Sequence, residues 1–192
     1  MDKRITILIA AETLLSERGF YGLSMKLLAQ RADIAAGTIY CYFKNKDALL
    51  SELLIHINMQ VANKLFENWT DTQSLQQKYE ILWKNTFNSV LRNPQRLNVV
   101  DMLLFRPGHD RKEIKNILRS NVFSPLFDFY QQGIDNNTFH AWPIEALLSL
   151  SFDSAINLAK HILRQRLEKN EELVAQVRKA SWLIIQKQNN QF

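Results

Sequence analysis

Cysteine, glycine and proline are all scarce in this chain of 192 residues, which contains one cysteine, five glycines and four prolines. A single cysteine cannot form an intrachain disulfide, and no spacing of cysteine and histidine matches a zinc site. No apolar run approaches the roughly 18 to 20 residues that a membrane-spanning helix needs. The residues after Met1 are charged and lack a cleavage-type site, so we expect no signal peptide, no membrane partner and a cytoplasmic protein.

The chain also has little excess charge of either sign. Lysine and arginine number 24 and aspartate and glutamate 19, which gives a net charge of +5. So small an excess does not by itself indicate a nucleic-acid partner, and the placement of the lysines matters more than their number. The four histidines lack the spacing of metal ligands, and no set of nucleophile, base and orienting residue stands out. We therefore expect no enzyme activity, no metal site and no cofactor.

Helical periodicity dominates the chain, as the scarcity of glycine and proline allows. Apolar residues recur at helical spacing, and no segment shows the convincing alternation of a strand. The pattern predicts an all-α protein of about nine helices, with a three-helix N-terminal domain in residues 1–48 and a larger helical domain in residues 49–192. The helices are expected at residues 2–18, 24–32, 34–43, 46–69, 73–91, 95–105, 110–133 (as one helix or two), 143–166 and 171–188.

The stretch 24–50 has the organisation of a helix-turn-helix. Ser24 can cap a short first helix with one apolar face, and Asp33 then interrupts the pattern. Ile34 and Ile39 follow at positions where they can be buried between two short helices separated by a tight turn. The second of these helices is the candidate reader of DNA.

The outward positions of this second helix carry small or hydroxylated side chains and no acidic ones. A bulky or anionic set would keep the helix out of the major groove or repel phosphate, so this set permits close approach. Asn45 can cap the long helix that follows. Lys46 lies at that N-terminus, where we expect it to be the stronger phosphate anchor and Lys44 the weaker one.

Several short motifs occur in this part of the chain at characteristic spacings. They are Ala10-Ala11, Gly19-Phe20, Leu28-Ala29, Gly37-Thr38-Ile39-Tyr40, Tyr42-Phe43 and Lys46-Asp47-Ala48-Leu49-Leu50. With these motifs, residues 4–50 resemble the N-terminal domain of the TetR family of bacterial transcriptional regulators. The resemblance implies a helix-turn-helix DNA-binding domain in residues 1–48 and a helical effector-binding and dimerisation domain in residues 49–192. It also implies an unknown small-molecule effector, a homodimer formed through the two C-terminal helices, and a long helix 46–69 that transmits the ligand state to the DNA-binding domain.

The same resemblance supports individual DNA contacts. Thr38 is the best candidate for a base contact, because its hydroxyl and methyl groups can meet a base edge or a thymine methyl. Tyr40 and Tyr42 match positions that contact phosphate or bases, although Tyr42 could serve packing and Ser24 could serve only as a cap. The chain departs from the family pattern at Asp33, commonly glycine, and at Ala35, commonly serine. The predicted DNA-binding residues are Ser24, Ala35, Ala36, Gly37, Thr38, Tyr40, Cys41, Tyr42, Lys44 and Lys46.

Aromatic residues are concentrated in the predicted central helices. They could line an apolar effector cavity, but aromatics at helical spacing more often form ordinary core. The candidate ligand-binding residues are Trp83, Phe87, Met102, Phe105, Phe123, Phe127, Tyr130, Phe152, Asp153 and Asn157. Asp153, Asn157 and His161 form one polar stripe on an otherwise apolar helix, and this stripe could face either a cavity or a dimer interface.

These observations together predict a ligand-responsive transcriptional regulator, and a repressor in particular. One helix-turn-helix reads only a few base pairs, so we expect a homodimer on a palindromic double-stranded DNA operator, released by a small hydrophobic or aromatic effector. The two C-terminal helices have apolar faces suited to a four-helix bundle between two copies. The alternative is a DNA-binding architectural or protein-recruiting factor without a small-molecule effector.

Overall fold

The computed structural model describes residues 2–106 and 122–187, which form helices and their connections. Within these residues, strand-like pairing is limited to an isolated bridge between Phe139 and Gln186. The all-α fold predicted from the sequence is confirmed. Contacts divide the described chain into unit 1, residues 2–60 and 95–106, and unit 2, residues 61–94 and 122–187.

Unit 1 begins with α1 (Lys3–Arg18), which forms as the sequence predicts. The Asp2 side chain caps it by accepting a hydrogen bond from the Arg4 amide at 2.9 Å, and Gly19 ends it with a φ of 69°. The apolar face buries every residue that helical spacing assigned to it, which are Ile7, Leu8, Ala11, Leu14 and Leu15. Full burial of a large aliphatic side chain contributes roughly 1.5 to 3 kcal/mol, so this face anchors the unit.

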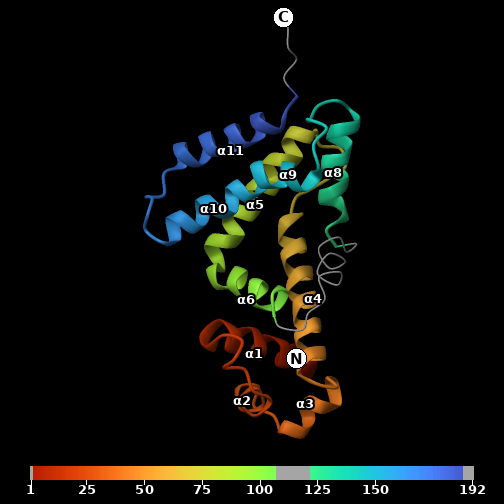
Figure 1. The fold of residues 1–192 in the computed structure, drawn as a ribbon, viewed down its shortest axis with the longest axis vertical. Coiled ribbons are helices and arrows are strands. Elements are labelled where there is room, and N and C mark those ends of the chain that lie inside the picture. The colour runs from red at the N-terminus through yellow and green to blue at the C-terminus, as the bar shows by residue number, and fades with distance from the viewer. Residues whose placement is uncertain (1, 107–121, 188–192) are drawn as a thin grey trace, which may run out of the picture. The chain divides into compact units, whose positions relative to one another are not determined.

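Unit 1 also contains α2 (Met25–Arg31), α3 (Ala36–Tyr42), the first part of α4 (Lys46–Leu65) and most of α6 (Pro94–Leu104) (Figure 1). Polar side chains join α6 to α1. The Arg96 guanidinium donates two hydrogen bonds to the Glu12 carboxylate, at 2.7 and 3.3 Å. The Ser16 hydroxyl donates to the side-chain carbonyl of Gln95 at 2.7 Å. A bidentate pair of this kind fixes geometry as well as adding energy, so it orients the start of α6 on α1.

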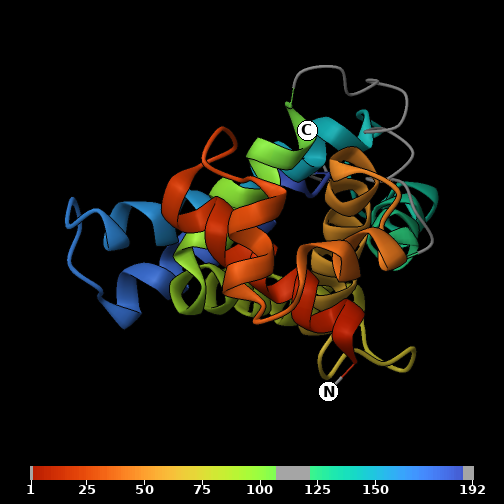
Figure 2. The same ribbon diagram turned by 90° about the horizontal axis from the view of Figure 1, so that it is seen from below.

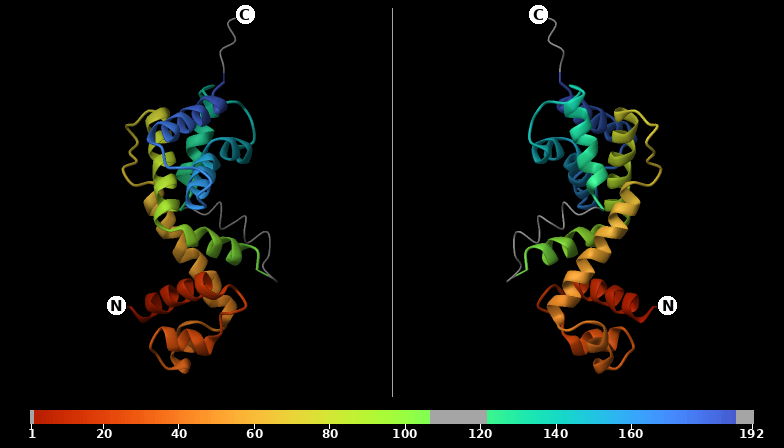
Figure 3. Two further views of the ribbon diagram at one scale, coloured as in Figure 1. Left: turned by 90° about the vertical axis from the view of Figure 1, so that its left-hand side faces the viewer. Right: turned by 90° about the vertical axis from the view of Figure 1, so that its right-hand side faces the viewer.

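Unit 2 contains the end of α4 together with α5 (Leu75–Arg92), α8 (Ser124–Asp135), α9 (Ile144–Leu150), α10 (Phe152–Leu163) and α11 (Glu171–Ile185). α10 contacts α5, α9 and α11, so it forms the centre of the unit (Figures 1 and 3). Ser74 and Gln77 cap α5 reciprocally, and Asn93 ends it. The buried stripe of α5 contains Tyr79, Leu82, Trp83 and Phe87, as predicted.

The prediction of one helix over residues 143–166 is wrong, because Ser151 separates α9 from α10. The Ser151 hydroxyl donates to the Leu147 carbonyl, and the Ser154 hydroxyl donates to the Ser151 carbonyl. The Tyr130 hydroxyl and the Ser151 hydroxyl also share a hydrogen bond of 2.7 Å. Hydroxyls that bind carbonyls of their own helix compete with the backbone hydrogen bonds and bend or interrupt the helix.

Two further boundaries differ from the sequence-based expectation. α4 ends at Leu65 rather than near Trp69, and Asn68 adopts the left-handed region with a φ of 65°. α8 continues to Asp135, so the polar turn predicted for residues 133–142 begins later and includes buried side-chain packing. Of the helix predicted for residues 110–133, the part at 110–121 lies outside the described residues.

Gly133 of α8 occupies a position that only a residue without a side chain fits. A Cβ atom there would lie 2.7 Å from Cγ of Phe139 and closer still to two other atoms of that ring. The ring is 1% exposed and packs between Tyr130 and Trp182, with centroid distances of 6.1 and 5.4 Å. Because the ring is confined on both sides, it has no room to retreat.

We expect Gly133→Ala to destabilise the protein by about 1 to 3 kcal/mol, the usual cost of overpacking a core. For a chain of this size the melting temperature should fall by roughly 3 to 10 °C, which thermal circular dichroism measures. Gly37→Ala is the matched control, because a Cβ at Gly37 would meet no atom within 4 Å and alanine favours the helix. An unchanged melting temperature for Gly133→Ala would contradict the close packing of Phe139.

Two asparagines, buried Asn58 and half-buried Asn85, differ in how their amides are satisfied. Asn58 of α4 is 7% exposed, and its Nδ2 has no hydrogen-bond partner among the described residues. Asn85 of α5, in contrast, donates to the carbonyls of Leu65 and Glu67 at 2.9 and 2.8 Å. A buried donor without an acceptor costs free energy, whereas a satisfied one holds two backbone groups in place.

We therefore expect Asn58→Leu to raise the free energy of unfolding by about 1 kcal/mol, since it removes an unsatisfied buried amide. Asn85→Leu is the opposite case and should lower it by about 1 to 3 kcal/mol, because two backbone carbonyls lose their donor. Urea titrations of both variants measure the difference. A loss of stability in Asn58→Leu as large as that in Asn85→Leu would show that the Asn58 amide is satisfied in solution.

Candidate DNA-binding surface

The helix-turn-helix predicted from the sequence is formed by α2 and α3 (Figure 2, seen from the side of these helices). The Ser24 hydroxyl accepts a hydrogen bond from the Leu27 amide at 3.2 Å and so caps α2. In the turn, Asp33 has a φ of 52°, and the Ile34 amide donates to a carbonyl of α2 at 3.0 Å. Ala35 has no side-chain oxygen, so α3 begins without a side-chain cap, as expected from the sequence.

The two faces of α3 differ sharply in burial. Ile39 is 0% exposed and Phe43, just beyond the helix, is 1% exposed, so these two residues anchor α3 in unit 1. The opposite face consists of six exposed residues, which are Ala35, Ala36, Gly37, Tyr40, Cys41 and Tyr42, and of half-buried Thr38. The space around Gly37 is open, which makes this face accessible to a large partner.

The chemistry of the exposed α3 face suits a DNA groove. No residue of α3 is acidic, so nothing in this helix repels phosphate. Alanine and glycine allow close approach of the backbone, and the threonine hydroxyl and methyl can meet base edges. Tyr40 and Tyr42 are 55% and 36% exposed and can donate their phenolic hydrogens to phosphate oxygens.

The two predicted phosphate anchors, Lys44 and Lys46, have different surroundings. Lys44 is exposed to solvent. Lys46 is half-buried, its ammonium donates to the Leu23 carbonyl at 2.7 Å, and it lies 4.9 Å from the ring centroid of Phe20. Phe20 and Leu23 could not be predicted as partners of Lys46, because a bond to a distant backbone carbonyl leaves no pattern in side-chain identities.

The start of α4 is built as predicted. The Asn45 side chain accepts a hydrogen bond from the Ala48 amide at 2.8 Å, which caps the helix directly after the helix-turn-helix. Cys41 lies on the α3 face with its Sγ 3.5 Å from the Gly37 carbonyl one turn earlier, a contact within the helix itself.

Some of the predicted ligand-binding residues are core residues of unit 2. Trp83 and Phe87 stack on one another at 5.4 Å, and the Trp83 indole donates to the Ser154 hydroxyl at 2.8 Å. Tyr130 is fully buried, and burial raises the pKa of its phenol. Asp153 is half-buried, and this burial raises the pKa of its carboxyl, an effect that the positive charge of Lys160 opposes.

The remaining candidates are less enclosed. Met102 and Phe105 belong to unit 1, and Phe105 is 76% exposed. In unit 2, three aromatic candidates are half-buried: Phe123, Phe127 and Phe152. Asn157 and His161 are exposed, so this polar stripe opens to the surface of unit 2.

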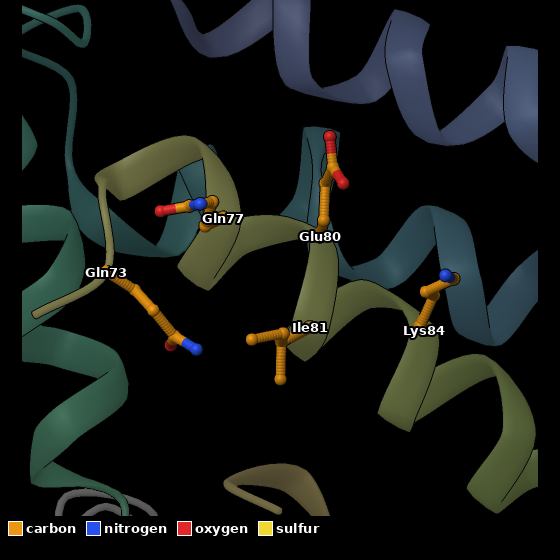
Figure 4. Close-up of a pocket in the computed structure, with 5 residues that line it drawn as sticks. All are labelled: Gln73, Gln77, Glu80, Ile81 and Lys84. Atoms are coloured by element: carbon orange, nitrogen blue, oxygen red, sulfur yellow. The ribbon is translucent and has the colours of Figure 1, made fainter. Parts of the chain in front are cut away.

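A shallow hollow of about 240 Å³ lies on α5 and the residues before it (Figure 4). Gln73, Gln77, Glu80, Ile81 and Lys84 line it, and four of these five side chains are polar or charged. None of the predicted ligand-binding residues is among them. The hollow therefore differs from the apolar effector site expected from the sequence.

Across 2–106 and 122–187, no three side chains from histidine, cysteine, aspartate and glutamate come together as ligands for a metal ion. In the same residues, no helix combines the length and apolar character needed to cross a membrane.

Comparison with protein families gives two matches that together cover most of the chain. Residues 7–53 match the model described as bacterial regulatory proteins, tetR family. Residues 74–186 match the model described as a tetracyclin repressor-like C-terminal domain. The first match contains α2 and α3, and the second contains α5 and the described helices α8 to α11.

Individual relatives agree with these matches. An HTH-type transcriptional regulator of Haemophilus influenzae is 30% identical over 182 residues, which span 94% of both chains. A solved structure of a TetR family protein from Vibrio parahaemolyticus is 30% identical, covers 97% of this chain and 100% of its own, and superposes with a TM-score of 0.83. The regulator FadR of Bacillus subtilis, solved in complex with stearoyl-CoA, is 20% identical with a TM-score of 0.73, covers 94% of this chain and 97% of its own, and shares the fold.

Proposed function

Because this chain belongs to the TetR family of bacterial transcriptional regulators, we propose that it is a repressor that binds a palindromic operator as a homodimer and is released by a small hydrophobic or aromatic effector. The family consists of regulators and not of enzymes. The observation that carries the proposal is the exposed, uncharged face of α3, formed by small and hydroxylated side chains.

In this proposal α3 enters the major groove and divides its contacts by chemistry. Half-buried Thr38 contacts a base, while the small, exposed residues at the start of α3 allow the backbone to approach. Tyr40, Tyr42 and Lys44 contact phosphates and set the orientation of the helix on the duplex. Specificity then depends on Thr38, and affinity depends on the phosphate contacts.

Dimerisation is assigned to α10 and α11 of unit 2. Both helices carry exposed apolar side chains, with Leu163 38%, Leu183 49% and Ile184 47% exposed. Asn157 and His161 of the polar stripe also lie exposed on α10, which favours a position in the dimer interface over a position in a cavity. Two copies of this helix pair would bury the apolar residues in a four-helix bundle and present two copies of α3 to DNA.

The effector is assigned to the aromatic interior of unit 2. Trp83, Phe87 and Tyr130 supply apolar surface, and the serine hydroxyls at the α9–α10 break supply hydrogen-bonding groups beside it. An apolar site with a few polar groups suits a hydrophobic ligand. Stearoyl-CoA, which the B. subtilis FadR structure contains, is a suitable first probe.

The test of DNA recognition is selection of bound sequences from a random duplex pool, using the full-length protein. We expect enrichment of one palindromic sequence, because a symmetric dimer reads two equivalent half-sites. Titration of the enriched duplex complex with stearoyl-CoA then tests release. Failure to enrich any sequence with folded, dimeric protein would contradict the proposal of operator binding.

A further inference from the structure

We propose that Lys46 is a positioning residue, which holds the DNA-reading helix in place by fastening the two ends of the helix-turn-helix, and is not primarily a phosphate anchor. The inference rests on the proposed function, because it concerns how α3 is presented to DNA. It changes the division of labour expected from the sequence, in which Lys46 was the stronger of two phosphate anchors.

The contacts of Lys46 span the whole helix-turn-helix. Leu23 directly precedes Ser24, the cap of α2, and Lys46 is the first residue of α4. The hydrogen bond of 2.7 Å from the Lys46 ammonium to the Leu23 carbonyl joins positions 23 residues apart in sequence. Both helices of the motif lie between these two residues, so this one bond closes a loop that contains α2 and α3.

The environment of the ammonium strengthens this bond. The ammonium lies 4.9 Å from the ring centroid of Phe20, within the range of a cation–π interaction. The Leu23 side chain is only 3% exposed, so its backbone carbonyl belongs to a packed part of unit 1. A charged donor bound to a carbonyl beside an aromatic ring makes a stronger hydrogen bond than one fully in water.

The recognition helix depends on such support. α3 has seven residues and no side-chain cap, and a helix this short has little stability of its own. Its orientation is therefore determined by tertiary contacts. These are the packing of buried Ile39 and Phe43 on its inner face and the hydrogen bond from Lys46 to the Leu23 carbonyl. Exposed Lys44, two residues earlier, provides a matched control with the same charge.

The test compares Lys46→Met, Lys46→Arg, Phe20→Leu and Lys44→Met by affinity for the selected duplex and for a scrambled duplex, over a range of salt concentrations. For Lys44→Met we expect equal losses on both duplexes and a salt slope reduced by about one, as for a phosphate contact. For Lys46→Met we expect roughly tenfold or greater loss on the selected duplex, little change on the scrambled one and an unchanged salt slope.

The remaining variants separate positioning from charge. Phe20→Leu removes no charge but should reproduce part of the Lys46→Met loss of specificity. Lys46→Arg should restore specificity, because a guanidinium can also donate to the Leu23 carbonyl and lie over the ring. Equal losses on both duplexes with a slope reduced by about one in Lys46→Met, and wild-type specificity in Phe20→Leu, would overturn the proposal.

Hydrogen exchange of the protein without DNA gives a readout that does not depend on the proposed function. In Lys46→Met the amides of residues 24–45 should exchange faster than in wild type, and in Lys44→Met they should not change. If selection enriches no duplex, this comparison still tests the closure. Unchanged exchange in both Lys46→Met and Phe20→Leu would overturn it.

Discussion

Ala36→Glu is expected to weaken binding to the selected operator by at least about 100-fold, or about 2.8 kcal/mol. Ala36 is the first residue of α3 and is exposed on the face assigned to the major groove. A carboxylate there would face the phosphates of both strands, and like charges at an interface cost several kcal/mol. Electrophoretic mobility shifts or fluorescence anisotropy with the labelled duplex measure the loss.

The same substitution should leave the fold intact, which makes its effect specific. An acidic residue in the first turn interacts favourably with the helix dipole, and α3 has none there in the natural sequence. The melting temperature should therefore stay the same or rise slightly. Ala36→Gln is the control of equal size without the charge, and it should lose much less affinity. Wild-type affinity in Ala36→Glu would remove α3 from the DNA interface.

Ile184→Arg is expected to raise the dimer dissociation constant by at least about 100-fold, because it would place a charge without a partner in the proposed α10–α11 interface. Ile184 is 47% exposed in the single chain, so an arginine there disturbs no core packing. Light scattering coupled to size exclusion should give the chain mass of 22.5 kDa instead of twice that value. Operator affinity should fall with it, since a monomer reads one half-site.

Ile55→Arg provides the matched control for this prediction. Ile55 lies on α4, is 50% exposed and is outside the two helices assigned to the interface. The control should remain a dimer of normal mass. If both Ile184→Arg and Leu183→Arg remain dimers, the interface lies on another face of the protein.

The helical periodicity of the sequence predicted most of the fold, because it reports burial directly. The five apolar positions of α1 are buried as their spacing required, and the caps at Ser24 and Asn45 form the hydrogen bonds assigned to them. The helix expected at residues 73–91 forms as α5, Leu75–Arg92, with each end within two residues of its predicted position. Local signals of this kind act within one or two turns and need no tertiary information.

The features that the sequence did not predict have a common cause, because each depends on tertiary contacts. The α9–α10 break depends on hydroxyls meeting carbonyls and on the buried Tyr130, which apolar periodicity does not report. The turn after α8 contains Phe139 because Gly133 leaves room for its ring. The partner of Lys46 is a backbone carbonyl, which is the same atom in every residue type. The exposed face of α3 was predictable, whereas the residues that hold it were not.

The most direct measurement is the affinity of the wild-type protein for its selected operator after insertion of about five base pairs, half a helical turn, between the two half-sites. A dimer with two copies of α3 requires both half-sites on one side of the duplex, so we expect affinity to fall at least about 100-fold, to the level of an isolated half-site. Unchanged affinity would contradict recognition of a palindrome by a dimer, because it would mean that each half-site is bound independently.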